Sequence, residues 1–154
     1  MGLNVMDYVT ILAVSVAGLS ALYARWVGVA AKNATIEAKR ANEISLLSRR
    51  IEIYDAYIHL KMHMLQKRGG AESREVSKFY YSSLSAKAFF KAELADDINN
   101  YYDACFWVAE IYNADDGRLN AEITKKQEPY LTREQELSKS LDKDFKEIFQ
   151  KIHN

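Results

Sequence analysis

The feature that most constrains this chain is an uncharged, largely apolar run near its N-terminus, residues 8–24, ahead of a strongly polar remainder. The seventeen residues of this run meet the lower limit for a helix that crosses a lipid bilayer. Arg25 can extend its charged end toward the interface and Trp26 suits an interface, so the buried stretch can reach Ala31. In a helix, Tyr8 and Trp26 stand about 27 Å apart along the axis, close to the thickness of the hydrocarbon core.

Three interpretations of the apolar run are open. A cleaved signal peptide normally begins with a basic segment, whereas no Lys or Arg precedes Arg25 here, although Val29-Ala30-Ala31 is similar to a cleavage site. A buried helix of a soluble domain is rarely apolar on all sides. The sequence therefore favours a retained transmembrane anchor, which we place at residues 1–31.

The flanks of the run predict its orientation. Residues 25–50 contain six basic and two acidic side chains, whereas only Asp7 precedes the run. Because basic flanks stay in the cytoplasm, we expect a single-pass protein of a bacterial inner membrane, with its N-terminus outside and the bulk of the chain inside. The residues expected to face lipid headgroups and to set this topology are Arg25, Trp26, Lys32, Lys39 and Arg40.

Charge and cysteine content restrict the possible functions and the compartment of the protein. The net charge of the whole chain is zero, so no general nucleic-acid binding is expected. Residues 51–154 carry fifteen basic and eighteen acidic side chains. Cys105 is the one cysteine, which excludes an internal disulfide and fits a small core residue in a reducing compartment.

Six glycines and one proline in 154 residues predict an all-α protein, because these residues are the main helix breakers. Ser73 and Asp96 are expected to cap helices, and Thr132 with Gln135 forms a capping-box pattern. The helices expected from the breaks and caps span residues 6–67, 73–92, 96–113, 118–127 and 132 onward.

The long first helix is expected to have three parts: the anchor, a polar stalk over residues 32–43, and a last part that is the first helix of a bundle. The bundle as a whole is expected to span residues 44–154. Short connections between amphipathic helices predict an antiparallel four-helix-type bundle. The apolar stripe expected to face the core of the bundle consists of Ile44, Leu47, Ile51, Tyr54, Ile58, Met62 and Leu65. The stripe expected on the last helix consists of Leu137, Leu141, Phe145, Ile148 and Ile152.

One metal-like pattern lies on the first helix. Asp55, His59 and His63 are spaced four apart and share one face, as ligands of zinc or another divalent ion can. A zinc hydrolase motif would also place a glutamate beside the first histidine, where this chain has Leu60. The alternative is a polar strip beside buried apolar residues, and no other cofactor is expected.

Aromatic doublets recur in the second and third expected helices. They could form a base-stacking surface or a ligand pocket, but at helical spacing one member of each doublet faces the core and the other its edge, which favours core packing. Acidic side chains near the start of the third helix, among them Asp96 and Asp97, are expected to act as caps and dipole partners. The chain has neither a glycine-rich phosphate loop nor a nucleophile elbow.

The arrangement of span, polar stalk, Ser48-Arg-Arg-Ile-Glu-Ile-Tyr-Asp55 and the later Ala88-Phe-Phe-Lys and Asp97-Ile-Asn-Asn-Tyr101 segments resembles small, uncharacterised bacterial single-pass inner-membrane proteins. The similarity covers residues 8–113. It implies a cytoplasmic helical bundle and no particular activity.

Two functions compete. Small residues that let helices approach closely in lipid recur along the run at Ala13, Ala17, Ala21, Ala24 and Gly28. They predict a homo-oligomer, and with it a non-enzymatic effector that perturbs the membrane in a bacterial defence or stress system. The alternative is a membrane-tethered scaffold or regulatory module that binds a cytoplasmic protein partner. An enzyme built on the Asp55, His59 and His63 face has the least support.

Overall fold

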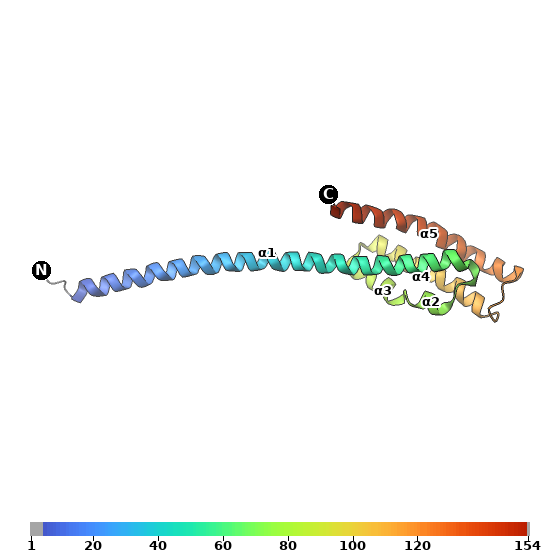
Figure 1. The fold of residues 1–154 in the computed structure, drawn as a ribbon, viewed down its shortest axis with the longest axis horizontal. Coiled ribbons are helices and arrows are strands. Elements are labelled where there is room, and N and C mark those ends of the chain that lie inside the picture. The colour runs from blue at the N-terminus through green and yellow to red at the C-terminus, as the bar shows by residue number, and fades with distance from the viewer. Residues whose placement is uncertain (1–4, 154) are drawn as a thin grey trace. The chain divides into compact units, whose positions relative to one another are not determined.

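The computed structural model of the chain describes the backbone of residues 5–153 and the side chains of residue 6 and residues 8–150. All regular structure in this part of the chain is helical, which confirms the predicted all-α class (Figure 1). The elements are α1 (Val5–Lys67), the 3-10 turn η1 (Arg68–Gly70), α2 (Ser73–Ser77), α3 (Tyr80–Phe89), α4 (Ala92–Asn113) and α5 (Ala121–His153). The single first helix expected over residues 6–67 is confirmed.

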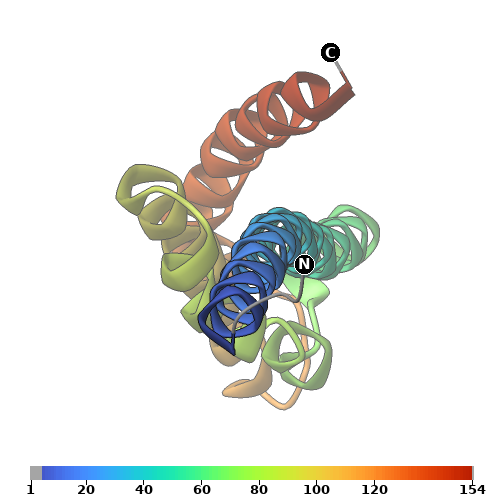
Figure 2. The same cartoon turned by 90° about the vertical axis from the view of Figure 1, so that its left-hand side faces the viewer.

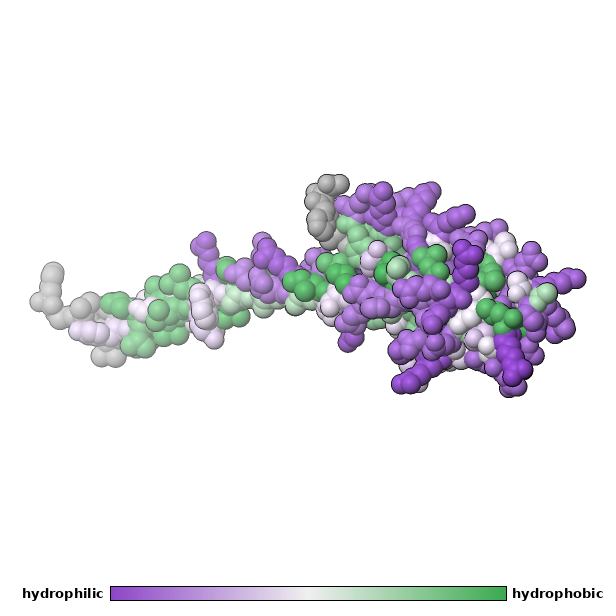
Figure 3. All heavy atoms as spheres, turned by 45° about the vertical axis from the view of Figure 1, so that its right-hand side comes forward, coloured by the Kyte–Doolittle hydropathy of each residue, from purple (hydrophilic) through white to green (hydrophobic). Residues whose placement is uncertain are grey.

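The chain divides into two compact units, Met1–Ser45 and Leu46–Asn154. The first is the N-terminal part of α1, on which the space-filling view shows a mainly hydrophobic stretch followed by one with hydrophilic side chains (Figure 3). The predicted anchor and stalk both fall within it. Residues 1–4 of the anchor, the side chain of Asp7 and that of Ile152 lie outside the described residues.

The second unit is the bundle. From Leu46 onward α1 runs in one direction, α2 and α3 return, α4 runs forward again and α5 returns (Figure 1). This confirms the predicted antiparallel four-helix-type arrangement. Seen nearly along the helices, α5 and α2 lie on opposite sides of the bundle (Figure 2). The most extensive contact between helices is that of α4 with α5.

Large aromatic side chains join α1 to the rest of the core. The ring of Tyr57 lies 5.1 Å from that of Tyr101 on α4 and 5.3 Å from that of Phe145 on α5. The ring of Phe90 meets Phe145 edge to face at 5.7 Å. Aromatic pairs at such distances stabilise a core beyond the area they bury. The fully buried residues of this core include Tyr57, Val76, Phe79, Ile98, Tyr101, Cys105, Val108, Leu141 and Phe145.

The buried face of α1 coincides only in part with the predicted stripe, of which Tyr54 and Ile58 are half-buried against the core. Ile53, Tyr57, Leu60 and Met64 are buried, whereas Ile44, Ile51, Met62 and Leu65 are exposed, Leu65 by 60%. The buried set is displaced from the predicted one by about one residue, or 100° around the helix. The two stripes have the same spacing, and the sequence does not reveal that Tyr57 is the side chain that the core accommodates.

Helix α2 begins at Ser73 as predicted, but both predicted caps and the predicted start of α4 are wrong. The expected helix over residues 73–92 is broken at Lys78 and Phe79 into α2 and α3, and its cap is Glu72 rather than Ser73. The Ser73 hydroxyl instead donates to Glu110 Oε1 at 3.1 Å. Helix α4 begins at Ala92, four residues before the expected cap Asp96.

Pro129 does not separate two helices. Helix α5 continues through it, so the expected helices over residues 118–127 and from 132 onward are one. Thr132 and Gln135 are therefore interior residues and not a capping box. The helix is capped at its N-terminus by Asn120, whose Oδ1 accepts from the Ile123 N–H at 2.8 Å.

The reason that Pro129 is tolerated lies in the packing on each side of it. Gln127 is buried, and its Nε2 donates to the carbonyl oxygens of Gly69 and Val108, both at 2.8 Å. On the other side of Pro129, Glu134 and Ser138 are buried. These contacts hold both halves of α5 and offset the backbone hydrogen bond that a proline removes.

Candidate functional site

The apolar part of α1 is exposed throughout. This helix is long and apolar enough to cross a membrane, and none of its apolar window is buried. The described residues therefore do not cover the run as the core of a soluble domain would cover a buried helix, whereas an N-terminal signal sequence would pass the same test. A Cβ atom placed on Gly28 would meet no atom within 4 Å. The small residues Ala13, Ala17, Ala21 and Ala24 are likewise exposed.

Two hydroxyl groups of the run donate hydrogen bonds to their own helix. Thr10 Oγ1 donates to the Met6 carbonyl and Ser15 Oγ to the Ile11 carbonyl, both at 2.8 Å. Such back-bonding satisfies a hydroxyl in an apolar environment. These two side chains therefore have less hydrogen-bonding capacity left for a water-filled pore.

The basic flank is also exposed. Arg25, Trp26, Lys32 and Lys39 are open to solvent, and the Trp26 ring lies 6.4 Å from that of Tyr23. Arg40 forms an exposed ion pair with Glu37 at 3.2 Å. The predicted headgroup residues are therefore accessible, as their proposed contact with lipid requires.

The three residues of the predicted metal face do not converge. His59 and His63 line a small cavity of about 380 Å³ with Glu75 and Lys78, whereas Asp55 lines a different groove, with Tyr54 and Asp142. His63 Nε2 accepts from the backbone N–H of Glu72 at 3.1 Å, which fixes the turn after η1. Among the residues described, no three His, Cys, Asp or Glu side chains gather as metal ligands do.

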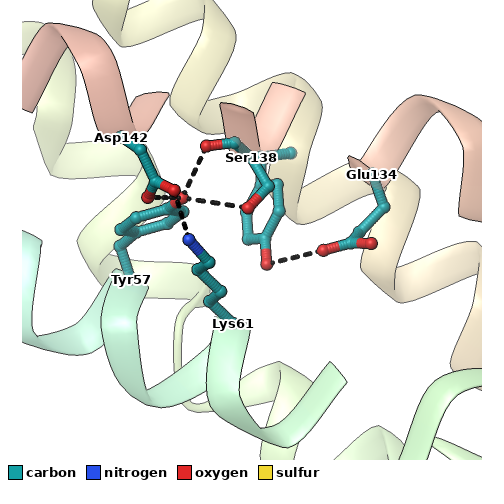
Figure 4. Close-up of polar contacts among 6 residues, drawn as sticks. Tyr57, Lys61, Glu134, Ser138 and Asp142 are labelled. Carbon is teal, nitrogen blue, oxygen red and sulfur yellow. Dashed lines mark hydrogen bonds and ion pairs between the residues drawn. The ribbon is translucent and has the colours of Figure 1, made fainter. Parts of the chain in front are cut away.

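A polar network lies between α1 and α5 (Figure 4). The Tyr57 hydroxyl lies 2.9 Å from Asp142 Oδ1, 3.0 Å from the Ser138 carbonyl oxygen and 3.2 Å from the Ser138 hydroxyl. Lys61 forms an ion pair with Asp142. Burial, reinforced by the Asp142 carboxylate, raises the pKa of Tyr57 far above its usual value, so its hydroxyl stays protonated and donates.

The second part of this network joins α4 to α5. The Tyr101 hydroxyl donates to Glu134 Oε1 at 3.0 Å, with both side chains buried. Burial raises the pKa values of Tyr101 and Glu134, and burial with the nearby Glu134 charge also raises the pKa of Cys105. Cys105 is therefore an unreactive thiol, as a core cysteine should be. Each of the two sets of hydrogen bonds ties a neighbouring helix to α5, and within each set the buried tyrosine hydroxyl is paired with a carboxylate.

Six aromatic rings form a continuous row across the bundle, which we call the aromatic surface. It crosses α3, α4 and the start of α5. Neighbouring ring centroids lie between 5.3 and 6.1 Å apart. In order the rings are Tyr81, Tyr80, Tyr102, Phe106, Trp107 and Tyr130.

Three of the six rings of the aromatic surface are exposed to solvent, whereas Tyr102, Phe106 and Tyr130 are half-buried against the core. Tyr81 is 79% exposed, Trp107 49% and Tyr80 41%, and the neighbouring Leu84 is exposed as well. Each aromatic doublet was expected to put one ring in the core, and this holds for Phe79 beside Tyr80. It holds as well for Phe106, which is partly buried and packs against the core, beside the exposed Trp107.

Acidic residues accompany the aromatic surface. Helix α4 contains five acidic side chains and no basic one. Two of them lie near Tyr102: burial above all raises the pKa of its hydroxyl, and Tyr80, Asp103 and Glu110 raise it further. Sequence patterns missed this surface because the spacing of the rings fits core packing equally well.

Comparison of the chain with protein-family models finds no matching family, and searches among curated proteins and solved structures find no significant match.

Proposed function

We propose that this protein is a membrane-tethered binding module: the N-terminal part of α1 anchors it in a lipid bilayer, and its helical bundle binds a protein partner. The observation that carries the proposal is the exposure of every large apolar side chain of the run, from Tyr8 to Val29, in the described part of the chain. Burying such a surface in lipid gains roughly 25 cal/mol per Å². A role in binding rather than catalysis is supported by the buried network, whose perturbed groups are already engaged with one another.

The orientation in this proposal has the bundle in the cytoplasm of a bacterium. Its support is the basic flank, because cytoplasmic loops carry an excess of Lys and Arg. Lys32 and Lys39 are exposed and have no ion-pair partner among the described residues. Both are therefore free to contact anionic headgroups.

Fractionation and fusion reporters test this proposal. The full chain should remain in the membrane pellet after alkaline carbonate extraction. A fluorescent protein fused after Asn154 should be bright, and alkaline phosphatase fused there should be inactive. Changing Lys32, Lys39 and Arg40 together to Glu should reduce the fraction with this topology. Extraction by carbonate, or an active phosphatase, contradicts the anchor or its orientation.

A second candidate function is a self-associating effector that perturbs the membrane. The observation in its favour is the exposed row of small residues in the run, at one end of which nothing lies within 4 Å of a Cβ on Gly28. The back-bonded hydroxyls of Thr10 and Ser15 argue against a wet pore lined by the span. Release of a dye from liposomes by the purified full chain would favour the effector over the tethered module.

A further inference from the structure

Exposed aromatic rings in a connected row require an explanation. Single apolar side chains are common on protein surfaces, but contiguous patches mark sites of interaction. Tyr and Trp dominate the binding energy of protein interfaces, because they combine a large contact area with few rotatable bonds. On this bundle Tyr81, Leu84 and Trp107 project from α3 and α4, and Trp107 is braced by the stacked ring of Tyr130 at 6.1 Å.

The charges beside the rings select the kind of partner. Asp103 and Glu110 belong to a helix with no basic residue. Two cations of the neighbouring helices are engaged: Lys87 pairs with Asp96 at 3.3 Å, and Arg133 donates to Asn100 at 3.1 Å. An aromatic face with carboxylates next to it attracts a cation twice, through the ring quadrupole and through the charge.

We propose that the aromatic surface binds a segment of a partner protein that is rich in lysine and arginine. The proposal rests on the function proposed above and names the chemistry of the partner. The basic side chains would lie over the faces of Tyr81 and Trp107 and point their charges toward Asp103 and Glu110. The apolar parts of the segment would cover Leu84.

The same charges disfavour other occupants. A nucleic acid would bring phosphates against Asp103 and Glu110, although its bases could stack on the rings. A second copy paired about a two-fold axis would bring the same carboxylates of two chains together, which costs free energy. A basic segment alone satisfies both the rings and the carboxylates.

Trp107 provides the measurement. The chain has two tryptophans, so the change Trp26→Phe leaves Trp107 as the one indole reporter at the surface. The full-length variant in a neutral detergent is titrated with hexa-arginine, with hexaglutamate and with oligothymidylate as parallel probes. We expect a saturable change of Trp107 fluorescence with hexa-arginine, weakened by salt, and none with the other two.

Matched variants separate local contacts from overall charge. Asp103→Asn with Glu110→Gln should weaken hexa-arginine binding about fivefold, since each exposed carboxylate contributes modestly. Glu128→Gln with Glu136→Gln removes the same total charge from exposed positions on α5 and should leave binding unchanged. The amide at position 110 can still accept from Ser73, so the fold should persist.

The fluorescence anisotropy of a labelled hexa-arginine gives a second measurement of binding, which does not depend on Trp107 fluorescence. Tyr81→Ala should weaken its binding about threefold, as expected for the loss of one exposed cation–π contact. Absence of binding, equal effects of the two charge variants, or preferential binding of oligothymidylate would overturn the basic-segment proposal. Concentration-dependent dimerisation abolished by Tyr81→Ala would overturn it in favour of a second copy. None of these outcomes affects carbonate extraction or topology, so the membrane anchor is tested independently of the basic-segment proposal.

Discussion

The hydroxyl of Tyr57 on α1 lies 2.9 Å from the carboxylate of Asp142 on α5, across a gap of 85 positions in sequence. The same carboxylate pairs with Lys61, one turn further along α1. Because Tyr57 also fills the space between Tyr101 and Phe145, one side chain provides both the apolar contact and the polar connection of α1 to the bundle. This connection sets which face of α1 is buried.

Removal of the Tyr57 hydroxyl should weaken the bundle while leaving its packing intact. Tyr57→Phe keeps the ring but removes the hydroxyl bonded to Ser138 and leaves Lys61 as the remaining partner of Asp142, at a cost of about 1–2 kcal/mol in the free energy of unfolding. Urea denaturation followed by circular dichroism measures this. Tyr81→Phe serves as the control, since the Tyr81 side chain is exposed and has no hydrogen bond in the described structure. Equal effects of the two changes would refute a structural role for the network.

Neutralising Glu134 should stabilise the protein near neutral pH. Burial raises the pKa of Glu134 in the folded state, so folding favours its protonated form, and this contribution to stability is lost as pH rises through the folded pKa. Glu134→Gln retains an acceptor for the Tyr101 hydroxyl and removes the charge. The variant should have the higher denaturant midpoint at pH 7, and the difference should vanish near pH 4, about the usual pKa of a carboxyl. A difference independent of pH would mean that Glu134 acts through packing alone.

Substitution of Gly69 should destabilise the fold, whereas substitution of Gly70 should not. A Cβ at Gly69 would lie 2.5 Å from Gln127 Oε1, and Gln127 is buried and holds the Gly69 and Val108 carbonyls. Gly69→Ala should therefore cost about 1–3 kcal/mol. At Gly70 the nearest atom is Leu119 Cδ1 at 3.8 Å, an ordinary contact, so Gly70→Ala should change the midpoint of thermal unfolding little. A similar loss in both variants would show that backbone freedom in η1, and not Gln127, is decisive.

Self-association through the membrane segment should depend on Ala17 and Ala21. Leucine at both positions keeps the segment apolar, so insertion should survive while close helix contact is blocked. We expect an oligomer in mild detergent that Ala17→Leu with Ala21→Leu dissociates, as measured by sedimentation. Val9→Leu with Val16→Leu adds bulk on another face of the helix and should have no effect. A native protein that is monomeric at all concentrations would eliminate this contact, and an oligomer insensitive to both pairs would place it elsewhere.

The sequence by itself determined the helical class, the single long first helix and the stretch able to cross a membrane. These properties depend on local composition: few glycines and prolines favour helix along the whole chain, and the hydropathy of residues 8–24 is independent of the bundle. The antiparallel order followed from the short connections.

Tertiary structure decided those features for which alternative contacts between helices were equally compatible with the sequence. The stripe of Ile51 and Leu65 and that of Tyr57 and Met64 have equal periodicity, and only packing against α4 and α5 selected the second. Pro129 stays within α5 because contacts on both sides outweigh its missing hydrogen bond. The aromatic surface likewise depends on rings from three helices meeting, because a repeating pattern in one helix does not show whether another helix covers it.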